Sequence, residues 1–204
     1  MKGTAFESGD MRIAEYLDRA ASKEPTPGGG GVAGVIGAMA ASLGEMVLAY
    51  SVGRKDLAQH EPRLNGCVRS VHAMRERLLE LADADAKAYA VLNDAMKMDK
   101  SDPERKTALP KAALAAAQVP LDVIRVISEL MLCFEEMSGI TNRWLRSDLA
   151  MATIFAEAVA RASRWNIVVN IAFLDGMSYG LLEDADGLLE RISAGASRTV
   201  AACA

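Results

Sequence analysis

Four consecutive glycines, Gly28 to Gly31, constrain this chain more than any other feature of its sequence. Pro25 and Pro27 precede them, and the segment 32–50 that follows is almost entirely apolar or small. Because glycine lacks a Cβ atom, a side chain, another backbone or a ligand can approach such a loop closely. The apolar segment predicts a buried helix, whose first N–H groups and positive dipole end would form an anion site at the glycines.

Two nucleotide-binding loops are excluded by what surrounds the glycines. A phosphate-binding loop ends in Gly-Lys followed by Ser or Thr, and no lysine follows the glycines here. That loop and the dinucleotide fingerprint both follow a β-strand, whereas residues 13–20 carry a helical pattern. A tight turn with close helix packing and a binding loop both remain open. We favour a binding loop, because one turn rarely needs four glycines.

The apolar segment also carries a stripe of small residues at spacings of four and three, namely Gly30, Gly34, Gly37, Ala41 and Gly44. This spacing places them on one face of a helix and predicts close contact with another helix. A membrane span is disfavoured because Glu45 lies inside the segment, glycine is abundant and no second span exists. We expect a homodimer in which this stripe packs across the two-fold axis.

Composition narrows the class of protein. A chain of 204 residues predicts a single domain spanning 1–204, and a net charge of -4 without a basic cluster predicts no nucleic-acid partner. Three cysteines without a C-x-x-C pair and only two histidines argue against a disulfide framework, a metal site and a histidine-assisted nucleophile. Residues 1–10 are polar and show no signal-peptide core, so we expect a cytoplasmic protein without a membrane partner.

The remaining segments show helical periodicity and no sustained alternation, which predicts an all-α bundle of about seven helices. The third helix is long and begins near Pro62. Pro110 is expected to kink or restart the next helix, and Pro120 to open a fifth. Gly176 is expected to break the chain before the last helix.

One carboxylate lies on the apolar face of the long third helix. Asp85 follows Leu81 by four residues and precedes Tyr89 by four, whereas Asp83 falls off this face and is expected to be solvated. A carboxylate on an apolar face is costly unless it is paired or functional. A catalytic role and a structural hydrogen bond to a neighbouring helix end both remain open for Asp85.

Other polar residues stand at positions with two interpretations. Lys55 follows the second helix, where a cation suits the dipole or contacts an anion, and Asp148 suits a helix first turn. Asn142 lies in a loop before that turn. Asn166 and Asn170 share one face of an apolar helical segment and need partners, for which the spacing alone favours a helix–helix contact.

In chain order these segments resemble the cyclodeaminase/cyclohydrolase family, which comprises the C-terminal domain of formiminotransferase-cyclodeaminase and the short bacterial methenyltetrahydrofolate cyclohydrolases. The matching pieces are Pro25-Thr26-Pro27-Gly28-Gly29-Gly30, Ser51-Val52-Gly53-Arg54-Lys55, Asp85-Ala86-Lys87-Ala88-Tyr89, Val119-Pro120-Leu121, Asn142, Ser147-Asp148 and Asn166-Ile167-Val168-Val169-Asn170. One departure is the bulky basic segment 143–146, where the family has small or apolar residues.

The resemblance implies an all-helical homodimer that binds folate near the glycine loop and the dimer interface. For its chemistry Asp85 is the best candidate for the catalytic base, because of its position on the apolar face, and Asp148 is the second candidate acid; which of the two is the base stays open. The substrate-binding residues that the resemblance implies are Pro27, Gly28, Gly29, Gly30, Lys55, Asn142, Asn166 and Asn170.

The reaction implied first is hydrolysis of 5,10-methenyltetrahydrofolate to 10-formyltetrahydrofolate, with the folate as substrate and no cofactor or metal. A formimidoyltetrahydrofolate cyclodeaminase is the alternative, and the missing formiminotransferase domain counts against it. A non-catalytic helical dimer that binds folate or another anion is the third possibility.

Overall fold

The computed structural model describes residues 8–174 and 180–204, which contain six α-helices, three short 3-10 segments and no strand. The α-helices are α1 (Ile13–Ala20), α2 (Gly29–Ala49), α3 (Glu61–Lys97), α4 (Arg105–Met137), α5 (Arg146–Ile171) and α6 (Leu181–Cys203). The 3-10 segments are η1 (Ser8–Asp10), η2 (Lys55–His60) and η3 (Arg143–Leu145). The expected all-α fold and long third helix are confirmed. Gly176 lies outside the described residues.

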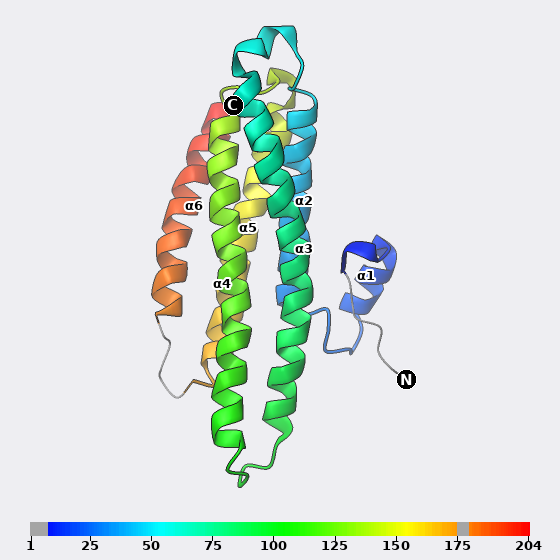
Figure 1. Cartoon of the computed structure of the whole chain (residues 1–204), viewed down its shortest axis with the longest axis vertical. Coiled ribbons are helices and arrows are strands. Elements are labelled where there is room, and N and C mark those ends of the chain that lie inside the picture. The colour runs from blue at the N-terminus through cyan, green and yellow to red at the C-terminus, as the bar shows by residue number, and fades with distance from the viewer. Residues whose placement is uncertain (1–7, 175–179) are drawn as a thin grey trace.

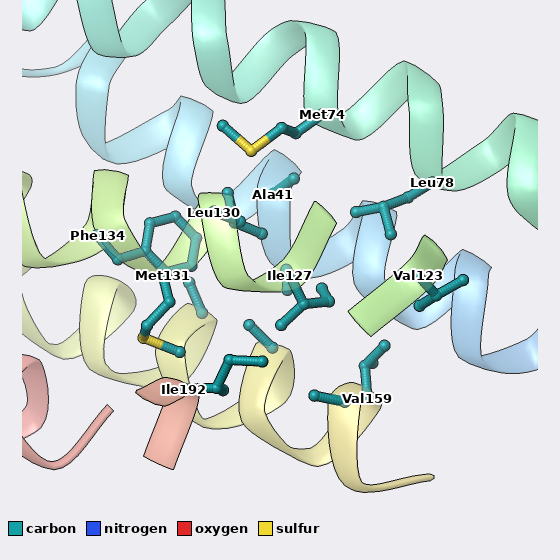
Figure 2. Close-up of a cluster of buried hydrophobic side chains, with 14 of the residues drawn as sticks. Ala41, Met74, Leu78, Val123, Ile127, Leu130, Met131, Phe134, Val159 and Ile192 are labelled. Carbon is teal, nitrogen blue, oxygen red and sulfur yellow. The ribbon is translucent and has the colours of Figure 1, made fainter. Parts of the chain in front are cut away.

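Four helices, α2 to α5, form an elongated bundle in which each packs against two others (Figure 1). α2 neighbours α3 and α5, and α4 closes the ring by packing between α3 and α5. α6 covers the outer side of α4 and α5, and the short α1 stands beside the bundle. Leu78, Ile127 and Phe134 belong to the apolar core that joins these helices (Figure 2).

α4 is one continuous helix with Pro110 and Pro120 inside it, which corrects the expected restarts and reduces the helix number to six. Proline has no N–H, so Pro120 leaves the carbonyl oxygen of Ala116 without its intrahelical donor. The Asn170 side chain of α5 supplies one, since its Nδ2 donates to Ala116 O at 2.9 Å. A neighbouring helix thus satisfies the acceptor that the proline leaves.

The small-residue stripe of α2 packs inside the chain, so the expectation that it faces a second subunit is wrong. A Cβ atom on Gly34 would lie 2.8 Å from Cβ of Ala82, and one on Gly37 would lie 3.2 Å from Cδ2 of Leu78, both on α3. A Cβ on Gly44 would overlap the ring of Phe134 on α4. The glycines therefore allow α2 to lie close against α3 and α4.

The opposite side of α2 and the adjoining α5 expose an unusual number of large apolar side chains. They are between 39% and 68% exposed and comprise Ile36, Met39, Met151, Ile154, Phe155, Trp165 and Val169. We call this set the α2/α5 face. α2 is also the only described helix long and apolar enough to span a membrane, and 50% of that apolar window is buried inside the bundle.

Candidate active site

Asp85 of α3 lies directly against the glycine loop at the start of α2. The backbone N–H of Gly31 donates to Asp85 Oδ2 at 3.0 Å. A Cβ atom on Gly30 would overlap the Asp85 carboxyl group, so a side chain at this position would displace that group. The anion held at this helix N-terminus is therefore the protein's own carboxylate.

The environment of Asp85 favours a carboxyl group that can exchange a proton. Burial raises the pKa of Asp85 above its ordinary value, and the hydrogen bond from Gly31 opposes that shift. A desolvated carboxylate of raised pKa is a better proton acceptor at neutral pH than an exposed one.

Asp85 lines a cavity of about 220 Å³ together with five of the other residues proposed for the site. Gly28, Gly29 and Gly30 form one side of the cavity, and the amides of Asn166 and Asn170 come from α5. The cavity is also lined by Pro25, Tyr89, Ala116 and Val169. Pro27 is buried beneath the loop, with its Cβ 3.6 Å from where a Cβ on Gly31 would lie. The structure thus brings the glycine loop, the carboxylate and two amides together.

Tyr16 of α1 is a neighbour of this site that the sequence pattern did not reveal. Its phenol oxygen lies 3.6 Å from where a Cβ on Gly31 would be. Burial, reinforced by the charges of Asp85 and Asp83, raises the pKa of Tyr16 to about 12, so the phenol stays protonated at neutral pH. Only the fold could reveal this, because nothing in the sequence pairs α1 with the glycine loop.

Asp83 is not a solvated residue, as its position had predicted, but an anchor for the N-terminal segment. Ser8 donates to Asp83 Oδ1 from its backbone N–H at 2.8 Å and from its hydroxyl at 2.7 Å. The carboxylate therefore fixes η1 against α3, on the side of the bundle where α1 places Tyr16 near Asp85.

Three other proposed site residues lie at the far end of the bundle. Lys55 is exposed at the start of η2, and Asp148 is half-buried in the first turn of α5. Asn142 precedes η3. α2 runs from Gly29 to Ala49, so its two ends are roughly 30 Å apart at 1.5 Å per residue. Within one chain the proposed residues therefore form two separate groups.

The Asn142 side chain already has structural partners. Its Oδ1 accepts from the backbone N–H of Trp144 at 3.2 Å, and its Nδ2 donates to the carbonyl of Tyr50 at 3.4 Å. Its own N–H donates to the hydroxyl of Ser51, which is buried. Asn142 thus joins the end of α2 to the start of η3, where the Arg143 guanidinium lies 4.8 Å from the centre of the Trp144 ring.

A comparison with models of known protein families shows to which family the chain belongs. The family model described as formiminotransferase-cyclodeaminase matches residues 12–179. The chain belongs to this family. The match includes the glycine loop, Asp85 and both amides of the cavity, as the resemblance implied.

Relatives in the formiminotransferase-cyclodeaminase family carry two activities in their names. A methenyltetrahydrofolate cyclohydrolase from Methylorubrum extorquens is 32% identical, with 91% of this chain and 95% of that protein covered. A formimidoyltransferase-cyclodeaminase from Mus musculus is 28% identical over 79% of this chain but only 31% of its own length. The crystal structure of formiminotetrahydrofolate cyclodeaminase from Thermotoga maritima superposes with a TM-score of 0.88 at 29% identity, covering 95% of this chain and 96% of that one.

Proposed function

We propose that this protein hydrolyses 5,10-methenyltetrahydrofolate to 10-formyltetrahydrofolate, reversibly, in one-carbon metabolism. The observation that carries the proposal is the desolvated Asp85 carboxylate, held by Gly31 N–H in a cavity with two amides. The full-length similarity to a protein named methenyltetrahydrofolate cyclohydrolase supports it.

In this reaction Asp85 acts as a general base toward water. The carboxylate accepts a proton as the water oxygen bonds to the methenyl carbon of the cationic amidinium, and its charge stabilises that cation. The tetrahedral intermediate then opens by cleavage of the bond between this carbon and one folate nitrogen. Asp85 returns the proton to that nitrogen. The hydroxyl proton of the intermediate is released to bulk water as the C=O bond forms, and the formyl group remains on the other nitrogen. The proposal requires only water and the folate, so no cofactor or metal is assigned.

Asn166 and Asn170 are assigned to orient the pterin ring or the attacking water. Asn170 uses its Nδ2 for Ala116 O, which fixes the amide plane and leaves Oδ1 as the acceptor it can offer. Asn166 Oδ1 lies 3.4 Å from where a Cβ on Gly29 would be, so it adjoins the loop. Because Asp85 already occupies the N–H of Gly31, we place the reacting carbon at the loop and the anionic glutamate tail elsewhere.

The active unit is proposed to be a homodimer formed through the α2/α5 face. Exposed apolar side chains that share one face of a protein often mark an interaction site. The cavity of about 220 Å³ is smaller than the roughly 300–1,000 Å³ of a typical small-molecule site, which supports a site whose walls are completed by a second chain. A two-fold axis that runs the two α2 helices antiparallel would bring Lys55 and Asp148 of one chain over the Asp85 cavity of the other.

This arrangement gives the separated residues a common site. Lys55 of the second chain would contact the glutamate tail, and Asp148 would act as the second acid. Asn142 would support this wall through its bonds to Tyr50 and Trp144. The cytoplasmic location and the absence of nucleic-acid and membrane partners stay predictions.

A spectrophotometric assay tests the proposed reaction. Methenyltetrahydrofolate absorbs in the near ultraviolet, and the purified protein should accelerate the loss of that absorbance. The similarity to a cyclodeaminase of known structure favours a second candidate, formimidoyltetrahydrofolate cyclodeamination, which would instead generate this absorbance and release ammonia. Asp85→Asn should abolish either activity. Asp94→Asn, an exposed carboxylate on the same helix, is the matched control and should retain it.

The dimer has its own test. Ile154→Lys places a charge on the α2/α5 face, where the side chain is 51% exposed, so the folded chain should become monomeric and lose activity. Leu132→Lys makes the same change at a residue 65% exposed on α4 and should alter neither property. A wild type that is monomeric at micromolar concentration and fully active contradicts the proposed dimer but leaves the reaction standing.

A further inference from the structure

Two thiols that are distant in sequence face each other between α3 and α4. The register of these antiparallel helices is fixed by an ion pair, since Arg63 Nε donates to Glu136 Oε1 at 2.8 Å. Cys67 lies one turn after Arg63 on α3, and Cys133 lies just under one turn before Glu136 on α4. This register places the two thiols next to each other, close enough for each to shift the pKa of the other. Packing of α3 against α4 therefore brings two cysteines together that are not related by a C-x-x-C motif in the sequence.

The two cysteines differ in access to solvent. Cys67 belongs to the core and is only 3% exposed. Cys133 is half-buried and lines an open groove of about 530 Å³ that also contains Ser70, Met74 and Arg77. A small dissolved reagent can therefore reach Cys133 but not Cys67.

The contact also makes the two thiols chemically unequal. The neighbouring Cys67 thiol lowers the pKa of Cys133 below its ordinary value, against the opposing effect of burial. The same contact, together with burial, raises the pKa of Cys67. The thiolate is the nucleophilic form of cysteine, so the accessible member of the pair is also the more reactive one.

We propose that Cys67 and Cys133 form an oxidation site that reacts with hydrogen peroxide to give an intramolecular disulfide. The Cys133 thiolate attacks one peroxide oxygen, the O–O bond breaks, and hydroxide leaves, giving a sulfenic acid. The Cys67 sulfur then attacks the Cys133 sulfur, the S–O bond breaks, and water leaves as the S–S bond forms. The two sulfurs together lose two electrons, which reduce the peroxide to water.

The location separates this chemistry from the proposed folate site. In Figure 1 α3 and α4 lie at the front of the bundle, and α2 and α5 lie behind them. The pair therefore remains accessible when the α2/α5 face is covered by a second chain. The disulfide would join the first part of α3 to the last part of α4. Such a cross-link restricts the unfolded chain, so the oxidised protein should melt at a higher temperature.

Mass spectrometry of the full chain treated with hydrogen peroxide tests the proposal. Under native conditions the wild type should lose two hydrogen atoms and yield one cross-linked peptide pair containing Cys67 and Cys133, reversed by dithiothreitol. Cys203→Ser, which removes the remaining cysteine, should behave identically. Cys67→Ser should instead leave a sulfenic acid at Cys133 that a cyclic dione traps, and Cys133→Ser should leave Cys67 unmodified.

Three results would overturn the proposal. The first is a wild type that keeps Cys67 and Cys133 as free thiols at peroxide concentrations that oxidise Cys203. The second is a disulfide that joins Cys203 or two different chains. The third is cross-linking of Cys67 to Cys133 that is as fast in urea as in the folded protein, since the folded contact would then contribute nothing.

Discussion

At the scale of single residues, one contact joins the fold to the proposed chemistry. The Asp85 carboxyl lies where a Cβ on residue 30 would be, and it accepts from the N–H of residue 31. The Asp85 carboxyl group can approach the loop because glycine has no side chain. In turn, its negative charge stabilises the positive end of the α2 dipole. Substitution of Gly30 by alanine would therefore displace the carboxylate itself.

Replacing Asp85 by asparagine should remove activity and increase stability. The loss of a general base costs about 100-fold or more in rate. Between about pH 3.9 and the raised pKa of Asp85, folded wild type keeps a proton that the unfolded chain releases, so its free energy of unfolding falls as pH rises. The asparagine variant avoids this loss and still accepts from Gly31. Thermal melts should show a higher Tm for the variant at neutral pH and a shrinking difference toward pH 3. A lower Tm at neutral pH with near-normal turnover would instead make Asp85 structural.

The rate should depend on pH through the same group. Because the base must be ionised, kcat/KM should fall as pH drops below the raised pKa of Asp85, at a pH above the ordinary carboxyl value. A pH–rate profile of the wild type checks this expectation. An acidic limb at or below about pH 3.9 would mean that another group carries the proton.

At the scale of helices, an amide on α5 compensates a proline on α4. Asn170 donates to the Ala116 oxygen that Pro120 leaves without a donor. Asn170→Leu should therefore lower the free energy of unfolding by about 1–3 kcal/mol, the cost of an unsatisfied buried acceptor. In a Pro120→Ala background the new N–H reclaims that oxygen, and the same substitution should cost less. Denaturant unfolding of the four proteins measures the coupling, and a purely additive result would contradict it.

Gly37→Leu tests which way the stripe of α2 faces. A side chain there meets Leu78 of α3 and Ile127 of α4, so overpacking should destabilise the fold by about 1–3 kcal/mol. Chemical denaturation measures that loss, and light scattering should show the subunit association of the folded fraction unchanged. A variant of normal stability that has become monomeric would instead indicate that the stripe lies in the dimer interface.

The sequence predicts the elements better than their partners, and the reason is physical. Helical periodicity locates α2, α3 and the apolar setting of Asp85, because each follows from spacing along one helix. The stripe of α2 predicts a close neighbour but carries no information on which helix that is. The sequence predicts a helix start at Pro120 because the Asn170 amide, which replaces the missing N–H of the proline as donor to Ala116 O, lies 50 residues later. The proximity of Tyr16 to the glycine loop, and of Cys67 to Cys133, arises only once the helices have packed.

At the scale of the whole molecule, the proposed dimer makes a complementation prediction. A heterodimer of an Asp85→Asn chain and an Asp148→Asn chain has one site with both substitutions and one site with neither. By two-fold symmetry it should retain roughly half of wild-type activity, although each variant homodimer is inactive. Two different affinity tags allow the heterodimer to be purified and assayed. An inactive heterodimer would place both carboxylates in a site within one chain, and an active Asp148→Asn homodimer would remove Asp148 from the reaction.

The hydrogen bond between Gly31 and Asp85 also makes one backbone amide a reporter on the acid. Its proton points at Asp85 Oδ2 from 3.0 Å between donor and acceptor, so its magnetic environment depends on the charge of that carboxyl. In a ¹H–¹⁵N spectrum the Gly31 resonance should move as pH is raised and reach its midpoint at the pKa of Asp85, without any substrate. In Asp85→Asn the same resonance should stay fixed over that interval. The ionisation on which the proposed chemistry depends can thus be followed at a single atom of the resting protein.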